Sequence, residues 1–402
     1  MNKKLTIGIV LPSIISKNGT AKQSIELAKV LETRGHTIQF FTFAYHPKTS
    51  FPEFDNFQVH YCVNVAKSLI YKMIKNISLL ETIYLYLGLV FIYKFRRLFK
   101  GKRIDILNPH DWMGIWVVSS LHDKAKIVAN INDIPDRQKG NILNKVKLFI
   151  DRRCVGYIDQ IIALDNKSKK MVVKWLGMNE GKISVIRSGI DIKKYQYFHS
   201  KIDIRTLFAI PKDVLVVACA NLLAPNRRYE DVLLAIARLD AQKYPVHAMI
   251  LSKLDFNKNY AEYLRRIIKE KHLEKKVHFV DKFFSDEERM TYIQSADILV
   301  FSNAPQTWGL TVIEAMALGI PVIVSDGSGV SEVLEDGVTA LVYKAKNVSA
   351  LEKKIRYCFE KKSVVGHIAK NAKTFVLQNY SWERFGLAIE NRMVFSITNI
   401  KS

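Results

Sequence analysis

The residues best suited to chemistry lie in the run Gln306–Glu314, Gln-Thr-Trp-Gly-Leu-Thr-Val-Ile-Glu. Its glycine stands directly before a predicted helix over Leu310–Leu318, which ends at Gly319. The first N–H groups of a helix have no partner inside it, and the helix dipole favours negative charge there, so such a start suits a phosphate group. The backbone that we expect to hold a diphosphate belongs to Trp308, Gly309, Leu310 and Thr311. A plain strand–loop–helix connection would show the same local pattern.

Glu314 lies in the first turns of this helix. A carboxylate near a helix start is favoured by the dipole, so a purely structural role is one interpretation. A bidentate contact to a ribose diol needs the same residue near the same helix end. We favour the ribose contact, because the surrounding pattern fits it.

Basic residues follow the predicted strand Val214–Ala220, in the run Asn221-Leu-Leu-Ala-Pro-Asn-Arg227-Arg228. A guanidinium pairs with a diphosphate through charge-assisted hydrogen bonds, each worth about 1.5–3 kcal/mol. Asn221, Arg227 and Arg228 are therefore candidate donor contacts. A solvated basic turn is the alternative, since the chain has 61 Lys and Arg residues.

Two weaker signals fall in the first half of the chain. His110 follows the predicted strand Ile104–Leu107 and could face a cleft, although a histidine satisfied by local hydrogen bonds is the more common case. Gly19 and Thr20 follow the first strand, where a glycine lets backbone approach a phosphate or a sugar. The sequence there is not G-x-G-x-x-G, so the usual dinucleotide fingerprint is absent.

These motifs can form one site only if the fold brings the ends of several strands together. The hydrophobic pattern predicts such a fold. Short apolar strands alternate with amphipathic helices, which is typical of parallel sheets with helices on both faces. The predicted strands are Leu5–Leu11, Ile38–Phe43, Ile104–Leu107, Ile127–Ile131, Ile158–Leu164, Ile183–Arg187, Val214–Ala220, Val246–Leu251, Val277–Val280, Asp297–Phe301, Pro321–Val324 and Ala340–Tyr343. The fold class is thus α/β, with two Rossmann-like, doubly wound domains that face a central cleft, where ligands bind at the strands' carboxyl ends.

The pattern starts twice, which sets the domain boundaries. The first domain is predicted over residues 1–195 and the second over residues 205–380. The connection falls in the charged, weakly patterned stretch Asp191–Ile210.

Composition narrows the classes of partner. The formal net charge of +23 indicates nucleic acid, an anionic membrane surface or acidic small molecules. No nucleic-acid module is recognisable, so no nucleic-acid partner is expected. The four cysteines are scattered without a C-x-x-C pair, which favours a reducing cytoplasm over a disulfide framework. Neither D-x-D nor a histidine metal motif occurs, so we expect no metal and no other cofactor.

The segment Cys62–Arg103 holds nine Lys or Arg residues and a single acid, Glu81, among apolar residues at helical spacing. A basic, aromatic-rich amphipathic helix is typical of a membrane-surface element, and each basic residue near an anionic leaflet contributes on the order of 1 kcal/mol. An ordinary domain helix with a charged solvent face is the alternative. The expected membrane contacts are Lys72, Lys75, Lys94, Arg96, Arg97 and Lys100.

With these residues placed, the chain resembles the GT-B fold glycosyltransferases of the large retaining family 4. The run Glu314-Ala-Met-Ala-Leu-Gly-Ile-Pro-Val-Ile is similar to that family's most specific motif. Gly35-His36, the stretch Val185–Asp191 and Gly329–Glu332 resemble further motifs along almost the whole length. Ser381-Trp382 resembles the start of a final helix, here about 382–402, that crosses back onto the first domain.

The resemblance implies a nucleotide-sugar donor bound mainly by the second domain, an acceptor bound mainly by the first, and no metal. The catalytic residues that it implies are His110 at the donor hexose, Arg227 at the diphosphate, and Gln306. It assigns Glu314 to the ribose and the backbone near Gly19 to the donor site. In retaining enzymes of this kind no covalent nucleophile is evident, and the donor phosphate takes the acceptor proton as its bond breaks.

Two positions depart from the family pattern. The family usually carries two basic residues six positions apart, where this chain has Asn221 and Arg227, and two glutamates separated by seven residues, where it has Gln306 and Glu314. Glutamine has nearly the shape of glutamate but cannot act as a nucleophile or base.

The leading hypothesis is a transferase that adds a sugar to a lipid-linked or cell-surface glycan acceptor, located in the cytoplasm and peripheral on the inner face of the membrane. The alternatives are a catalytically weak or non-catalytic sugar-nucleotide-binding partner subunit and a nucleotide-sugar epimerase on the same fold.

Overall fold

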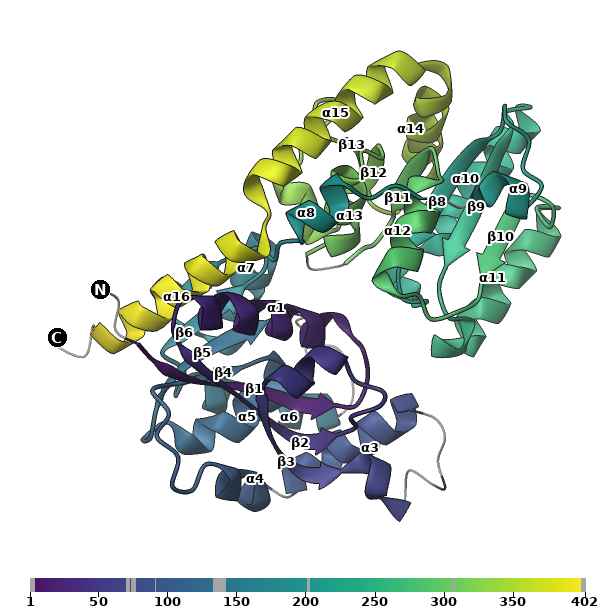
Figure 1. Cartoon of the computed structure of the whole chain (residues 1–402). Coiled ribbons are helices and arrows are strands. Elements are labelled where there is room, and N and C mark those ends of the chain that lie inside the picture. Colours follow the sequence, from purple (N-terminus) through teal and green to yellow (C-terminus); the bar gives the residue numbers. More distant parts are fainter. Residues whose placement is uncertain are drawn as a thin grey trace. The chain divides into compact units, whose positions relative to one another are not determined.

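The structure is a computed structural model that describes residues 4–69, 73, 77–90, 92–132, 142–200, 203–305 and 308–398. The chain divides into two compact units (Figure 1). Unit 1 comprises Met1–Ser188 and Trp382–Ser402, and unit 2 comprises Gly189–Ser381. The expected connection Asp191–Ile210 therefore belongs to unit 2, where it carries two short helices.

Unit 1 is built on a seven-stranded parallel sheet with the order β3-β2-β1-β4-β5-β6-β7. Its strands are β1 Thr6–Ile14, β2 Thr37–Tyr45, β3 Gln58–Asn64, β4 Ile106–Pro109, β5 Lys126–Ile131, β6 Gln160–Ala163 and β7 Ile183–Val185. Its α-helices are α1 Gly19–Thr33, α3 Ile77–Val90, α4 Ile92–Leu98, α5 Asp111–Val118, α6 Ile142–Val155, α7 Asn166–Leu176 and α16 Trp382–Thr398. Short 3₁₀ turns are η1 Pro52–Asn56, η2 Val65–Lys67, η3 Ser119–Leu121 and η4 Glu180–Lys182.

Unit 2 is built on a six-stranded parallel sheet with the order β10-β9-β8-β11-β12-β13. Its strands are β8 Leu215–Ala220, β9 Val246–Leu251, β10 Val277–Val280, β11 Ile298–Phe301, β12 Val322–Ser325 and β13 Leu341–Tyr343. Its α-helices are α8 Ile192–Gln196, α9 Ile204–Leu207, α10 Tyr229–Ala241, α11 Lys258–Glu270, α12 Asp286–Gln294, α13 Leu310–Ala317, α14 Val348–Glu360 and α15 Lys362–Asn379. The 3₁₀ turns are η5 Pro225–Arg227, η6 Leu254–Phe256 and η7 Gly329–Val333.

The apolar runs that predicted the strands are buried on both faces, as parallel sheets covered by helices require. Every residue of β4, β6, β8 and β11 is buried. The strand order reverses between β1 and β4 in unit 1 and between β8 and β11 in unit 2, and ligands of doubly wound sheets bind at the carboxyl ends of such neighbours. The predicted α/β fold with two Rossmann-like sheets is confirmed.

Helix α16 returns the chain to unit 1, where it runs beside α1 (Figure 1). A Cβ atom built on Gly386 would lie 2.7 Å from Val30 Cβ, so the glycine lets the two helices approach closely. Glu390 of α16 is buried and bonded to Arg34 and to His36, the latter at 2.9 Å between Oε1 and Nε2.

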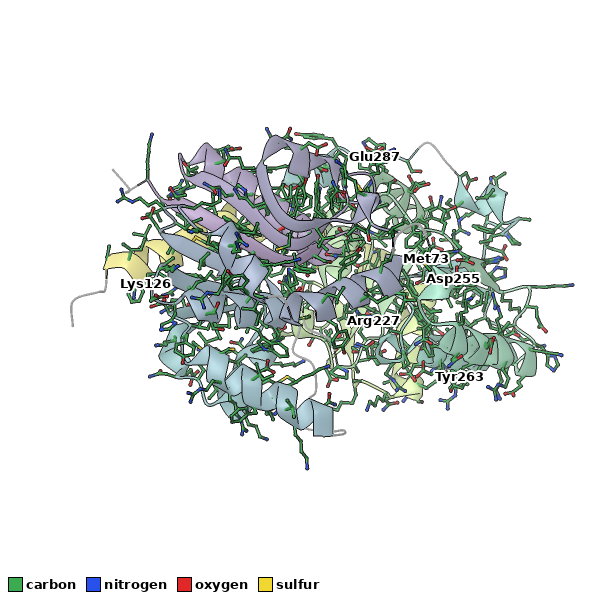
Figure 2. The ribbon with its side chains drawn as sticks, turned by 90° about the horizontal axis from the view of Figure 1, so that it is seen from below. Met73, Lys126, Arg227, Asp255, Tyr263 and Glu287 are labelled. Atoms are coloured by element: carbon green, nitrogen blue, oxygen red, sulfur yellow. The ribbon has the colours of Figure 1, made fainter. Side chains whose placement is uncertain are left out.

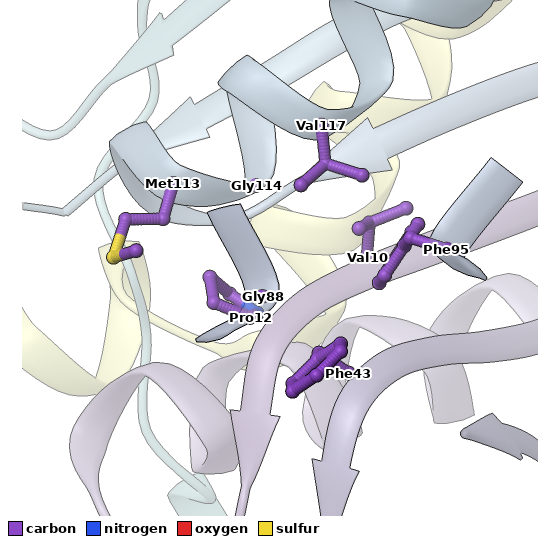
Figure 3. Close-up of a pocket in the computed structure, with 8 residues that line it drawn as sticks. All are labelled: Val10, Pro12, Phe43, Gly88, Phe95, Met113, Gly114 and Val117. Carbon is purple, nitrogen blue, oxygen red and sulfur yellow. The ribbon is translucent and has the colours of Figure 1, made fainter. Parts of the chain in front are cut away.

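The expectation of one basic amphipathic helix over Cys62–Arg103 is wrong. Cys62 lies in β3, and the segment continues through η2 before α3 and α4. The apolar side of these helices is covered by the sheet rather than free, because Leu80, Tyr84, Phe95 and Phe99 are buried in the core of unit 1. Figure 3 shows an apolar pocket at this junction, between β1, β2, α3, α4 and α5. The residues that line it are Val10, Pro12, Phe43, Gly88, Phe95, Met113, Gly114 and Val117.

Candidate functional site

The loops that follow β8 and β11 are bonded to each other at the carboxyl end of the second sheet. Ser302 donates to the backbone carbonyl of Arg227 at 2.7 Å, and the Ala304 N–H donates to the carbonyl of Asn226 at 2.9 Å. These bonds place Arg227, whose side chain is labelled in Figure 2, on the loop that adjoins the approach to α13. Two motifs about 80 residues apart in sequence are thus brought together, as the sheet topology predicts.

Gly309 caps α13 without a side-chain hydrogen bond. The N–H groups of Leu310 and Thr311 find no acceptor among the described residues, as the first donors of a helix require if they are to bind an anion. A Cβ on Gly309 would lie 2.9 Å from Val330 Cγ1 and 3.0 Å from Phe301 Cζ, so this position leaves no room for a larger residue. Trp308 is buried, with its ring centroid 5.4 Å from that of Tyr380.

Glu314 is held by two side chains of unit 2. Its Oε1 accepts a hydrogen bond of 2.8 Å from the Tyr195 hydroxyl and another of 2.8 Å from the Arg289 guanidinium. The carboxylate is the fifth residue of α13, one turn inside the helix, because α13 begins at Leu310 as predicted. Its second oxygen makes no hydrogen bond to any residue that the structure describes, which leaves it available for a ligand hydroxyl.

The electrostatics of this group keep Glu314 paired with a cation. Burial raises the pKa of Tyr195 well above its usual value, and the neighbouring Glu314 charge raises it further. The Glu314 charge also raises the pKa of Arg289. The tyrosine therefore stays a neutral donor and the arginine stays charged, so both donate hydrogen bonds to Glu314.

The side chain of Arg228 forms an ion pair with the helix that it precedes, α10. It adopts a left-handed backbone at the start of α10, and its guanidinium meets the buried Asp231 in a bidentate pair, with N–O distances of 2.6 and 2.7 Å. Asn221 offers its backbone carbonyl to the Tyr229 hydroxyl at 3.0 Å. The structure thus groups the predicted contacts Asn221, Arg227 and Arg228 on one loop, and the Arg228 side chain is paired with Asp231 of α10.

In unit 1, His110 lies at the carboxyl end of β4 and has no exposed surface. Its Nε2 lies 3.0 Å from Asn108 Oδ1, while Nδ1 has no hydrogen-bond partner among the described residues. Burial lowers the pKa of this imidazole to about 3, so the ring is neutral at physiological pH. It can exchange a hydrogen bond with a sugar hydroxyl but cannot supply a positive charge.

Gly19 and Thr20 open α1 after the first strand. Asn18 caps the helix by accepting from the Ala21 N–H, and the Asn132 side chain donates to the Thr20 hydroxyl at 3.3 Å. A Cβ on Gly19 would meet nothing within 4 Å, so the structure itself gives no steric reason for a glycine there.

Three predicted site residues, Gln306, Lys72 and Lys75, lie outside the described residues. The other expected membrane contacts, Lys94, Arg96, Arg97 and Lys100, are exposed on α4 and the turn after it. Within the described ranges no cluster of three or more His, Cys, Asp or Glu side chains has a metal-binding arrangement. None of the described helices is both long and apolar enough to cross a bilayer.

Two family descriptions cover most of the chain. Residues 17–194 match Glycosyltransferase Family 4, and residues 200–375 match Glycosyl transferases group 1. The chain belongs to the family 4-type group 1 glycosyltransferases. The resemblance carried by Glu314 and the motifs around it is thereby confirmed.

Individual relatives of this glycosyltransferase are distant. An uncharacterized glycosyltransferase of Methanocaldococcus jannaschii is 23% identical over 73% of this chain and 76% of its own length. A D-inositol 3-phosphate glycosyltransferase of Mycobacterium tuberculosis is 21% identical over 69% of this chain. The match spans 59% of that relative's length, less than two thirds.

Solved structures share the fold across nearly the whole chain. A glycosyltransferase from Rickettsia africae superposes with a TM-score of 0.77 at 18% identity, over 99% of this chain and 100% of that one. The Anabaena protein HepE, solved in complex with UDP and glucose, gives a TM-score of 0.74 at 18% identity, over 98% of this chain and 100% of its own. At these identities the likeness shows the GT-B fold.

Tyr195 and Arg289 are the site residues that sequence reasoning missed in this glycosyltransferase. Tyr195 fell at the predicted domain boundary, and Arg289 belongs to a helix with no recognised motif. A local signal existed for each helix, because Asp191 caps α8 and Ser285 with Glu288 forms a capping box on α12. Those caps predict where the helices begin, but not that both helices meet Glu314.

Proposed function

We propose that this glycosyltransferase moves a sugar from a nucleotide-sugar donor, with retention, to a lipid-linked or cell-surface glycan acceptor at the membrane. The observation that carries the donor part is the grouping of Arg227 with the open helix start at Gly309 and with Glu314. At the carboxyl end of this sheet, a cation and free N–H groups suit a diphosphate, and a carboxylate suits the ribose joined to it. The Anabaena neighbour has also been solved with UDP-glucose, which supports a donor of this class.

In the proposed reaction the protein acts by position and charge. Arg227 and the N–H groups of Leu310 and Thr311 stabilise the leaving diphosphate, so no metal ion is needed for that charge. The free Glu314 oxygen binds the ribose, while Tyr195 and Arg289 fix the carboxylate. The acceptor oxygen bonds to the anomeric carbon as the sugar–phosphate bond breaks, and the leaving phosphate takes the acceptor's proton. Neutral His110 contacts the hexose.

The membrane part rests on exposed apolar and basic side chains of unit 1. Leu69 and Met73 are exposed over 75% and 83% of their surface, and Tyr93 over 72% (Figure 2 labels Met73). Basic residues of α4 lie beside Tyr93, and the Arg97 guanidinium lies 5.9 Å from its ring centroid. Exposed aromatic and basic residues together favour an anionic membrane surface, on the cytoplasmic face.

Donor binding is tested by thermal unfolding of the full chain with UDP-, GDP- and ADP-sugars. A ligand at 100 times its Kd stabilises the folded state by about 2.7 kcal/mol. We expect one nucleotide class to raise the midpoint, and Arg227→Ala or Glu314→Ala to remove most of that rise. Arg266→Ala, an exposed arginine on α11, is the matched control. A rise that survives in both site variants would contradict the proposed donor site.

Product analysis then separates the reaction classes. Transfer of the sugar to an acceptor with retained anomeric configuration supports the proposal. Binding without any turnover would instead indicate a non-catalytic partner subunit, which Asn221 and Gln306 motivate. Conversion of the nucleotide-sugar without an acceptor would indicate an epimerase.

A further inference from the structure

A hollow of unit 2, of about 480 Å³, opens at the amino ends of the strands, opposite the candidate donor site at their carboxyl ends. It lies at the amino ends of β8, β11 and β12, between those strand starts and one face of α15. β8 has six residues and β11 has four, so the amino and carboxyl ends of these strands are separated by roughly 13–20 Å. A ligand in this hollow would therefore occupy a site of its own.

Four lysines rim the hollow: Lys212, Lys362, Lys370 and Lys373. In the described part of the chain none of them forms an ion pair with a carboxylate, and the Lys362 ammonium lies 5.5 Å from the centroid of the Phe359 ring. The single acid of the lining, Asp297, is already compensated, because its Oδ2 lies 2.6 Å from an Arg205 nitrogen and accepts the Val216 N–H at 2.6 Å. The rim thus carries an excess of positive charge that no neighbour neutralises.

The floor of the hollow is apolar. Val214, Ile298, Val365 and Ala369 line it and are each at most 7% exposed. Charge at the mouth and apolar surface beneath it suit a molecule whose apolar body enters first and whose negative group stays at the rim. Inorganic phosphate alone would leave the floor uncovered.

Gly366 is a further indication that the hollow remains unfilled by side chains. It is the fifth residue of α15 and lines the hollow, and a Cβ built on it would meet nothing within 4 Å. Glycine weakens a helix interior relative to alanine, so packing gives no reason for it here. A longer side chain at this position would project into the hollow and fill it.

We propose that the hollow is a ligand site for a small amphiphilic anion, one that joins a carboxylate or phosphate group to an acyl or aromatic body. The apolar body packs on Val214, Ile298 and Ala369, and the rim lysines pair with the anionic group. The site is independent of the proposed nucleotide-sugar site, which lies at the carboxyl ends of the strands.

The test is isothermal titration calorimetry on the full chain with octyl phosphate and octanoate as acyl probes and 1-naphthyl phosphate as the aromatic probe. We expect saturable binding of at least one class, and binding of inorganic phosphate at least tenfold weaker. The probe that binds most tightly shows whether the site prefers a phosphate or a carboxylate group, and an acyl or an aromatic body. Arg227→Ala should leave the binding unchanged, which separates it from occupancy of the donor site.

Two variants act on the hollow in different ways. Gly366→Leu should fill it and weaken binding at least tenfold, and Lys370→Glu with Lys373→Glu should do the same through charge even if the leucine variant fails to fold. The matched control is Lys353→Glu with Lys361→Glu, an equal change of charge outside the lining. The proposal is overturned if no probe binds saturably, if both hollow variants bind as the parent does, or if the control loses binding equally.

Discussion

The carboxylate of Glu314 depends on two residues from different helices, which makes its geometry testable by mutation. Tyr195→Phe removes a buried hydrogen bond to a charged group and should lower the free energy of unfolding by about 1.5–3 kcal/mol. Arg289→Met leaves the carboxylate without its cation and should cost roughly 2–3 kcal/mol, below the full value for buried pairs because 29% of the Arg289 side chain is exposed.

Chemical denaturation with a double-mutant cycle measures this coupling. In a Glu314→Gln background the cost of Arg289→Met should shrink, since the neutral amide no longer requires a cation. Nucleotide-sugar binding should weaken in both single variants, because the free oxygen is no longer held in place. Equal costs in both backgrounds would show that Arg289 does not act through Glu314.

A second residue-scale effect concerns pH. His247 Nδ1 lies 3.1 Å from His278 Nε2 across β9 and β10, near Arg205, Lys276 and Asp240. Burial lowers the pKa of His247 to about 4. The unfolded chain therefore binds the proton more readily than the folded one between about pH 6.5 and 4, and stability is lost as the pH falls through that window.

We expect His247→Gln to reduce the acid loss by about 1–2 kcal/mol, a value discounted for partial exposure. Thermal unfolding from pH 7.5 to 4.5 measures it, with the exposed His367→Gln as control. Parallel pH profiles for the parent and His247→Gln would refute this account.

Residue identities predicted part of the grouping that makes up the candidate site. Arg227, Gly309 and Glu314 stood out because each follows a strand, and topology then brings strand ends together. Tyr195 and Arg289 could not be predicted, because their contact with Glu314 joins positions 119 and 25 residues away. The sequence was compatible with the ion pair of Arg228 and Asp231, because Arg228 stands directly before α10 and Asp231 lies in the first turn of that helix.

At the scale of elements, the start of α13 depends on a glycine. In Gly309→Ala the new methyl would press on Val330 and Phe301, which should displace the turn and cost about 1–3 kcal/mol. Nucleotide-sugar binding should fall with it. The matched control is Gly366→Ala in α15, where the space is open and alanine should stabilise the helix by about 0.5–1 kcal/mol. Loss of stability in both variants would contradict the steric argument.

The contact of α16 with α1 gives a second element-scale prediction. Gly386→Ala should force the helices apart against Val30 and lower stability by about 1–3 kcal/mol, despite alanine's better helix propensity. Adding Val30→Gly should restore part of the loss, because it removes the Cβ as well as both methyl groups that the new alanine would meet, while the second glycine itself weakens α1. Denaturation of the single and double variants decides the matter, and failure of the rescue would exclude this packing.

The elements themselves were predicted unevenly. Buried strands such as β8 and β11 follow from unbroken apolar runs. Strand β3 was missed because it lies at the sheet edge, where His60 and Asn64 interrupt the apolar pattern. The Cys62–Arg103 segment was misjudged for a related reason: spacing shows that a helix has an apolar side, but not whether protein or lipid covers it.

At the scale of the whole molecule, the net charge of +23 predicts salt-sensitive binding to anionic vesicles. Charge reversal of Lys94, Arg96 and Arg97 to Glu should strongly reduce flotation with anionic liposomes, since each basic residue contributes on the order of 1 kcal/mol. The control reverses three exposed lysines of unit 2, Lys269, Lys271 and Lys275. Unchanged flotation, or an equal loss in the control, would reject the contact on α4.

The return of α16 to unit 1 separates the order of synthesis from the order of folding. In the sequence, unit 2 stands between the two segments that form unit 1. The ribosome therefore makes all of Gly189–Ser381 before it makes the helix that covers α1. At roughly 5–20 residues per second, that delay lasts on the order of 10–40 s. During this interval the face of α1 that bears Val30 is uncovered on the nascent chain. The unit that begins first is therefore the one that is completed last.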